Sequence, residues 1–350
     1  PLSKTLFFEH QNLGELCDYF LQSHLARLRT LLGVAETKAS VEPTAPPPPV
    51  PAVAVAARAT VPTRAAQPRQ APPKGDEPLD IAIVGLGGRY PQADTLEEFW
   101  NNLRDGRDAV TEIPATRWDH DRYFDAEVGK PGKSYSKWGG FISGVDEFDP
   151  LFFNMSPLEA RQTDPQERLF LQCVYQTLED AGQTRESLRR AGRVGVFVGA
   201  MYQEYQLYAA QAQARGEALV VGASLGSIAN RISYFCDFHG PSLSVDTMCS
   251  SSLTALHLAC QSLRTGDCEV AIAGGVNVSV HPNKYLMLSH AQFASSTGRC
   301  TAFAAGGDGY VPAEAVGAVL LRPLAAALAD GDQVYGVIKA IEVNHGGRTN

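Results

Sequence analysis

The sequence lacks several features that would assign it to common protein classes. It has no apolar run long enough to cross a bilayer, so no transmembrane helix and no membrane partner are expected. It has no excess of basic residues, and a net charge of −8 argues against nucleic acid as a partner. It has no C-x-x-C pair, so its seven cysteines suggest no zinc or other metal site, and free thiols in a reducing cytoplasm are the simplest account. It begins without Met or a signal peptide, and we expect a piece of a longer chain.

The stretch Leu243–Leu263 organises the rest of the sequence. Its first residues, Leu243 and Val245, alternate with polar ones and predict a short buried strand. Apolar residues then recur at helical spacing: Leu253, Leu256 and Cys260. Cys249 therefore lies where a strand ends and a helix begins, where free backbone N–H groups and the helix dipole favour an anion. A thiol in that place ionises more easily and is a better nucleophile. The simpler alternative is that Cys249 is a buried core cysteine.

The amino-acid sequence of this stretch decides between a nucleophilic cysteine and a buried core cysteine. Asp246–Ser252 reads DTMCSSS, and LTALHLAC follows it. The motif closely resembles the nucleophile motif of β-ketoacyl synthases of modular polyketide synthases. The resemblance implies that Cys249 is catalytic and accepts the growing acyl chain as a thioester. Ala usually precedes that cysteine in the family, so Met248 departs from the common form and is expected to shape the substrate pocket.

The N-terminal part of the chain is expected to form two different segments. Residues 1–30 contain one apolar helix face and resemble the C-terminal helices of an acyl carrier protein, without the upstream serine that carries phosphopantetheine. The alternative is an ordinary amphipathic helix that docks another chain. Residues 31–78 are rich in Pro and Ala without a period, cannot bury a core, and predict an interdomain linker.

Residues 79–350 resemble the N-terminal portion of a ketosynthase domain. The resemblance implies an α/β, thiolase-like fold, preceded here by the small helical segment. Five strands are expected to complete its first half, beginning near Ile81, Val194, Leu243, Val270 and Val316. Residues 334–338 are expected to begin the second half. The glycines after the first strand do not form the dinucleotide-binding motif G-x-G-x-x-G, because Tyr90 occupies the position of its third glycine.

Two local patterns within this portion carry further predictions. Asp164 as the N-cap, with Pro165 after it and Glu167 three positions on, predicts a helix with a capping box, which Gly182 ends. Near the last strand, the family usually has Gly-Glu-Gly, but this chain has Ala313–Ala315. The missing glycines either stiffen that backbone or mark a divergent member. Residues 311–312 and 343–350 look most like ketosynthases whose acyltransferase acts in trans.

Gly222–Gly226 provides the main competing signal. It reads G-x-S-x-G, the nucleophile elbow of α/β-hydrolases, and it follows the apolar residues 219–221. A serine hydrolase that uses Ser224 is therefore a distant alternative. The residues after it resemble the ketosynthase helix before the nucleophile strand, and that resemblance instead places Ser224 near the acyl pocket as a substrate-binding residue.

The resemblance also implies partners and a mechanism. Carrier proteins upstream and downstream would deliver substrates on phosphopantetheine, a trans-acting acyltransferase would take part indirectly, the domain would form a homodimer, and no cofactor would bind directly. The family's two catalytic histidines lie in motifs that this sequence does not contain. We expect His257 to be a packed structural residue and His345 a loop residue. If the first histidine is replaced, the alternative is a non-elongating ketosynthase that only passes acyl groups on.

Overall fold

The computed structural model describes residues 13–25, 27 and 80–348. The chain divides into two units, residues 1–68 and 69–350, and each is described by itself. In the first unit, helix α2 spans Leu13–Ser23, as the apolar spacing predicts. Leu21 and Leu25 remain exposed, which agrees with a helix that needs a partner to bury its apolar face. The predicted linker, residues 31–78, lies outside the described residues.

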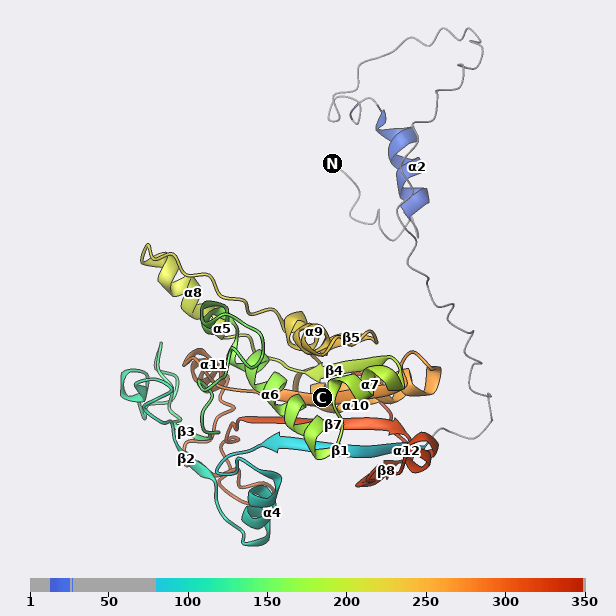
Figure 1. The fold of residues 1–350 in the computed structure, drawn as a ribbon. Coiled ribbons are helices and arrows are strands. Elements are labelled where there is room, and N and C mark those ends of the chain that lie inside the picture. The colour runs from blue at the N-terminus through green and yellow to red at the C-terminus, as the bar shows by residue number, and fades with distance from the viewer. Residues whose placement is uncertain (1–12, 26, 28–79, 349–350) are drawn as a thin grey trace. The chain divides into compact units, whose positions relative to one another are not determined.

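The second unit is built on a mixed sheet, which among the described residues has six strands (Figure 1). In chain order these are β1 (Ile81–Arg89), β4 (Val194–Gly199), β5 (Ser242–Val245), β6 (Val270–Asn277), β7 (Ala315–Pro323) and β8 (Gly336–Ile338). Their order in the sheet is β5-β4-β6-β7-β1-β8. β4 pairs parallel with β5 and β6, whereas β7 pairs antiparallel with β6 and β1. All five strands predicted for the first half are present.

Helices cover both faces of this sheet. The helices described in this unit are α4 (Leu96–Arg104), α5 (Pro157–Gln162), α6 (Pro165–Asp180), α7 (Arg185–Ala191), α8 (Tyr205–Ala214), α9 (Leu225–Cys236), α10 (Ser251–Thr265), α11 (Asn283–His290) and α12 (Leu324–Asp330). Of these, α6 and α9 pack on one face and α10 on the other. Short 3₁₀ turns are η1 (His120–Arg122) and η2 (Met248–Ser250), and β2 (Val110–Glu112) pairs with β3 (Trp138–Gly140) in a small second sheet.

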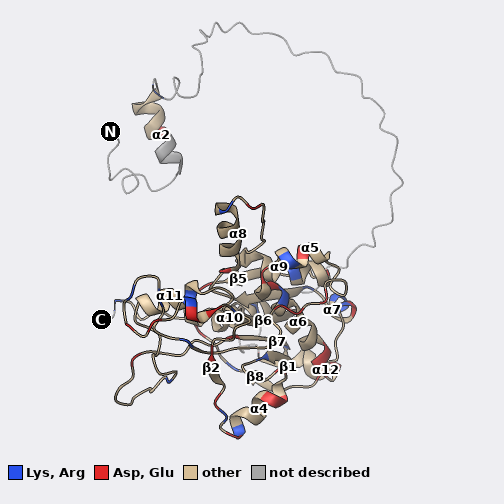
Figure 2. Ribbon diagram, turned by 90° about the vertical axis from the view of Figure 1, so that its left-hand side faces the viewer, with Lys and Arg blue, Asp and Glu red and all other residues tan. Residues whose placement is uncertain are grey.

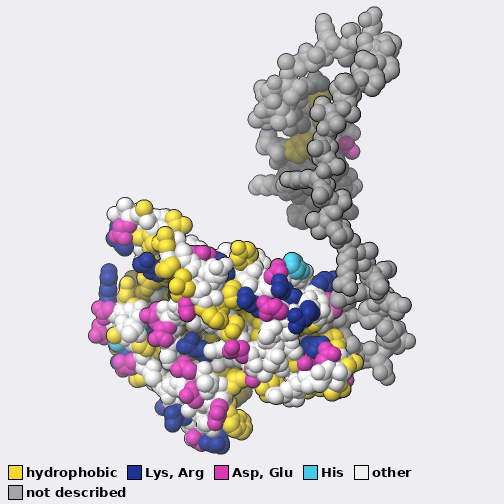
Figure 3. Space-filling view, in the orientation of Figure 1, with side chains coloured by type: hydrophobic (Ala, Val, Ile, Leu, Met, Phe, Trp, Pro, Cys, Tyr) yellow, Lys and Arg dark blue, Asp and Glu magenta, His cyan; other side chains and the backbone are white. Residues whose placement is uncertain are grey.

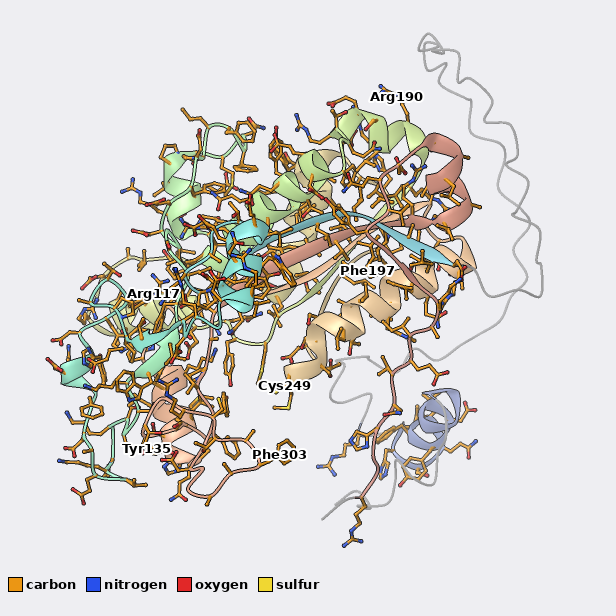
Figure 4. The ribbon with its side chains drawn as sticks, turned by 90° about the horizontal axis from the view of Figure 1, so that it is seen from below. Arg117, Tyr135, Arg190, Phe197, Cys249 and Phe303 are labelled. Atoms are coloured by element: carbon orange, nitrogen blue, oxygen red, sulfur yellow. The ribbon has the colours of Figure 1, made fainter. Side chains whose placement is uncertain are left out.

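Alternating residues of the strands divide the core into two layers. Val196 and Val198 of β4 pack in one cluster with α6 and α9, whereas Phe197 between them packs with α10 on the opposite face (Figure 4). Figure 2 shows that acidic and basic residues lie mainly on the helices and loops around the sheet. The core is therefore apolar on both faces of the sheet, as expected for a sheet with helices on each side.

The start of α6 agrees in part with the prediction from the sequence. Asp164 caps the helix by accepting a hydrogen bond from the Gln166 N–H at 2.8 Å, and Gly182 follows its end with φ of +63°. The predicted capping box is wrong, because the Glu167 carboxylate faces α9. There it pairs with Arg231 Nε at 2.8 Å and accepts a hydrogen bond from the Ser227 hydroxyl.

Two further expectations about the sheet need correction. β5 is an edge strand, paired among the described residues only with β4, and Leu243 is 46% exposed rather than buried. The segment expected to begin a second half instead extends the first sheet. Its residues Gly336–Ile338 pair antiparallel with the edge of β1 that β7 leaves open.

The described residues also bear on two absences. None of their helices is long and apolar enough to cross a membrane. They contain no group of three or more His, Cys, Asp or Glu side chains arranged to hold a metal ion.

Candidate active site around Cys249

Cys249 lies in η2, four residues after β5 ends and two before α10 begins. The turn is held by its own polar groups. The Met248 N–H donates to the Asp246 carboxylate at 2.9 Å, and the Ser251 hydroxyl donates to the Met248 carbonyl at 2.6 Å. Figure 4 shows Cys249 at the N-terminal end of α10, with its side chain directed away from the body of the helix. The thiol is exposed, so the alternative of a buried core cysteine is wrong.

Two glycines allow α10 to begin against the sheet. A Cβ atom on Gly199, at the end of β4, would lie 2.4 Å from the Ser252 backbone nitrogen. A Cβ atom on Gly275, in β6, would lie 2.9 Å from the Ser252 Cβ. Any larger residue at either position would push the first turn of α10 outward and displace Cys249 with it.

Met248 adopts a left-handed backbone conformation with φ of +57°. This region is costly for a residue with a side chain, and such strain persists only where the surrounding structure enforces it. The Met248 side chain is 65% exposed and lines the same cavity as Cys249. It therefore belongs to the wall of this cavity and not to the core.

The cavity beside Cys249 has a volume of about 470 Å³. Most of its wall is apolar or backbone, and four polar side chains join Cys249 and the serines of α10 there: Tyr202, Asn277, Lys284 and Tyr310. Burial raises the pKa of the Tyr202 and Tyr310 phenols. Both side chains line the same cavity as the Cys249 thiol. These four polar residues could not be predicted from the sequence, because no motif marks them.

Lys284 is the most unusual residue of the wall. It is 4% exposed, and its ammonium donates to the Asn277 Oδ1 at 2.9 Å and lies 4.7 Å from the centre of the Tyr202 ring. Burial lowers the pKa of Lys284 to about 8, and the charges of Glu204 and Glu314 oppose that shift. Burial likewise raises the pKa of Glu204 to about 7.

The segment Ala313–Ala315 forms another part of the wall. Ala313 and Ala315 line the cavity, and neither has a positive φ, so neither position requires glycine for its backbone. Between them the buried Glu314 carboxylate receives two bonds from Arg117, at 2.8 and 3.3 Å. It also accepts the backbone N–H groups of Ile142 at 3.0 Å and Ser279 at 2.9 Å. The two alanines therefore add methyl groups to the cavity wall and leave the network around Glu314 intact.

Ser224 does not line this cavity. It is the exposed residue before α9, and its side chain makes no capping hydrogen bond. The preceding residues 219–221 form no strand. A nucleophile elbow requires a strand before its serine, so the hydrolase alternative lacks its structural basis. The structure brings Met248 and Cys249 together and leaves Ser224 apart.

Neither His257 nor His345 lines the cavity. His257 lies on α10, where its Nδ1 is 3.3 Å from the Ile341 carbonyl oxygen. The exposed His345 accepts a local hydrogen bond from the Gly347 N–H at 2.9 Å. His257 is thus a partly buried packing residue and His345 a loop residue, as predicted.

Known proteins resemble this chain in sequence and in fold. Residues 79–327 match the family described as "Beta-ketoacyl synthase, N-terminal domain". Over its whole length, the chain is 57% identical to polyketide synthase PksL of Bacillus subtilis and 56% identical to polyketide synthase ThaG of Burkholderia thailandensis, and it spans only 8% and 6% of these proteins.

Solved structures agree with these matches. An oxazolomycin ketosynthase domain from Streptomyces albus is 59% identical, with a TM-score of 0.75 over 77% of this chain and 46% of that one. The ketosynthase from module 6 of the bacillaene synthase of Bacillus subtilis is 40% identical, with a TM-score of 0.68 over 77% of this chain and 45% of that one.

Proposed function

Because this chain belongs to the β-ketoacyl synthase family, as part of the ketosynthase domain of a modular polyketide synthase, we propose that it extends a polyketide chain by decarboxylative Claisen condensation. The observation that carries the proposal is the exposed Cys249 thiol at a largely apolar cavity of about 470 Å³. Such a cavity has the size and lining of a small-molecule site.

The reaction proceeds in two transfers. In the first, Cys249 forms a thioester with the acyl chain while the bond to the carrier's pantetheine sulfur breaks, and the thiol proton passes to that sulfur. In the second, a malonyl thioester loses carbon dioxide, and its carbanion attacks the Cys249 thioester carbonyl. The cysteine leaves as a thiolate and the carrier holds a β-ketoacyl chain.

The chain's own residues would assist in two ways. Backbone N–H groups at the start of α10, including that of Cys249, would stabilise the tetrahedral oxyanion. Met248 and the alanines beside Glu314 would bound the acyl chain near the thioester. In the family, two histidines support the decarboxylation, in motifs that these 350 residues do not contain.

The proposed partners are acyl carrier proteins, upstream and downstream, that present substrates on phosphopantetheine. Alignment of PksL and ThaG along the whole chain supports a longer multidomain protein, in which residues 1–30 end a carrier protein and residues 31–78 link it to the ketosynthase. An acyltransferase acting in trans would load the downstream carrier. No cofactor binds the ketosynthase itself.

We also propose a homodimer and a cytoplasmic location. The open edge of β5, on which the apolar side chain of Leu243 is exposed, is a surface that a second copy would cover. The six cysteines whose side chains the structure describes are free thiols, as in a reducing compartment. Figure 3 shows acidic and basic side chains interspersed on the viewed face of residues 80–348. This face has no basic patch of the kind that binds nucleic acid.

The test supplies the complete ketosynthase domain with an acyl-loaded and a malonyl-loaded carrier protein. Mass spectrometry of the downstream carrier distinguishes the outcomes. A β-ketoacyl chain supports elongation, an unchanged acyl chain supports the non-elongating alternative, and neither product from an intact, folded domain rejects both. The Cys249→Ala domain is the control and should give no product.

A further inference from the structure

The cavity beside Cys249 contains one feature that condensation does not require. Among the described residues that line it, Lys284 is the only Lys, Arg, Asp or Glu. A buried lysine loses most of its hydration, which is costly unless other groups replace the water. A plain hydrocarbon chain would gain nothing from this ammonium, so its position suggests a polar substrate group.

The ammonium is held in place and keeps hydrogen-bonding capacity. The Asn277 amide nitrogen donates to the Ala313 carbonyl at 2.7 Å, which fixes the amide oxygen that accepts from Lys284 at 2.9 Å. The Tyr202 ring lies on another side of the ammonium, at 4.7 Å. An ammonium has three N–H donors, and Asn277 takes only one of them as a hydrogen bond. Donors therefore remain for a group that occupies the cavity.

The surrounding charges indicate which kind of group this is. The carboxylates of Glu204 and Glu314 lie close enough to Lys284 to raise its pKa against the effect of burial. Glu314 is already paired with Arg117, and one carboxylate oxygen of the buried Glu204 has no hydrogen-bond partner among the described residues. With two carboxylates already close to it, the ammonium has no unmatched charge left for an anionic substrate group, whereas a neutral oxygen would accept a hydrogen bond without adding charge.

We propose that Lys284 is a specificity-determining residue that donates a hydrogen bond to a neutral oxygen substituent, a hydroxyl or keto group, on the acyl chain carried by Cys249. The inference rests on the proposed function, because it requires an acyl chain on Cys249. It gives the substrate class as oxygenated rather than fully reduced acyl chains.

The experiment is a competition between two acyl thioesters of equal length. The complete ketosynthase domain receives an equimolar mixture of a saturated N-acetylcysteamine thioester and its β-hydroxy or δ-hydroxy analogue. The ratio of the two acyl masses on the Cys249 peptide is measured at early times. A hydrogen bond to a charged donor predicts a preference of roughly ten- to hundredfold for one hydroxylated chain. Lys284→Met should bring the ratio of the two acyl chains close to one, whereas the exposed Lys339→Met control should leave the ratio unchanged.

A second measurement uses the wild-type domain and does not depend on how a variant folds. Because the pKa of Lys284 is about 8, the preference should fall as the pH rises from 7.5 to 9.5. Glu204 and Glu314 face Lys284. Burial raises the pKa of Glu204 to about 7, below this range, and burial holds the pKa of Tyr202 above its usual value. The nucleophile Cys249 is common to both thioesters, so its reactivity cancels in the ratio.

The outcomes separate this inference from the proposed function. Equal loading of saturated and hydroxylated chains by the wild-type domain at every pH would overturn the role of Lys284 and leave the acyl transfer standing. A preference that survives in a loading-competent Lys284→Met domain would overturn it as well. Failure of every thioester to load on Cys249 would instead reject the proposed function.

Discussion

Replacing Glu314 with Gln should destabilise the ketosynthase far more than the loss of one charge at the surface. Both oxygens of the Glu314 carboxylate face donors. One accepts from the Ser279 N–H and Arg117 Nε, and the other from the Ile142 N–H and Arg117 Nη2. In Glu314→Gln, either orientation of the amide turns an N–H₂ group toward these donors. The Arg117 side chain, 7% exposed, also loses its counter-charge.

The magnitude follows from that burial. Breaking a buried ion pair by removing one partner costs about 3–5 kcal/mol, because an uncompensated charge remains inside the protein. We expect a loss in this range in the free energy of unfolding, measured by urea denaturation of the complete domain at pH 7. Glu217→Gln is the matched control: the same chemical change breaks the Arg215–Glu217 pair, in which both side chains are mostly exposed, and it should have no measurable effect.

A double-mutant cycle with Arg117→Met tests the assigned cause. Arg117 and Glu314 share one network, so the two changes should be non-additive by about 0.5–3 kcal/mol, and the double variant should lose less stability than the sum of the singles. Additive losses, or a Glu314→Gln domain as stable as the Glu217→Gln control, would refute the reasoning.

Three further outcomes are expected of the complete domain. Met248→Ala should favour acyl chains branched near the thioester by roughly ten- to two-hundredfold in relative loading with an unchanged melting temperature, because the side chain lines the cavity and is mostly exposed; a lowered melting temperature with unchanged selectivity would contradict this. Iodoacetamide should label the exposed Cys249 and Cys300 in the folded protein, as mapped by mass spectrometry, and early labelling of the buried thiols would count against the structure. Burial raises the pKa of all four buried thiols: Cys173, Cys236, Cys260 and Cys268. Burial also raises the pKa of Asp164 from 3.8 to about 6. The protonated carboxyl therefore stabilises the folded protein fully below about pH 4, and this stabilisation is lost as the pH rises through about 6. Asp164→Asn keeps the helix cap without that loss and should gain about 3 kcal/mol relative to the wild type between pH 4 and 8 in urea denaturation, and a constant difference would reject this assignment.

The sequence allowed prediction of features that depend on neighbouring residues. The cap at Asp164 and the position of Cys249 between a strand and a helix follow from short patterns. The alternation of Leu243 and Val245 with polar residues likewise located β5. These signals suffice because each is set by residues a few positions apart.

Other features depend on which surfaces meet in space. Leu243 and Leu253 fit an apolar pattern yet are exposed, since the pattern does not say which apolar face another element covers. Arg117 and Glu314 pair across 197 positions, and Lys284 becomes a cavity residue only when α11 packs beside β6. No spacing in the chain encodes these contacts, so the charged part of the pocket wall could not be predicted.

The central claim is that Cys249 carries the acyl chain, and covalent loading tests it most directly. The complete domain is incubated with an acyl thioester, and the intact mass and the modified peptide are determined by mass spectrometry. We predict one added acyl group, located on Cys249 and absent from the Cys249→Ala domain. Acylation that persists in Cys249→Ala, or that maps to Ser224 in the wild type, would contradict the claim.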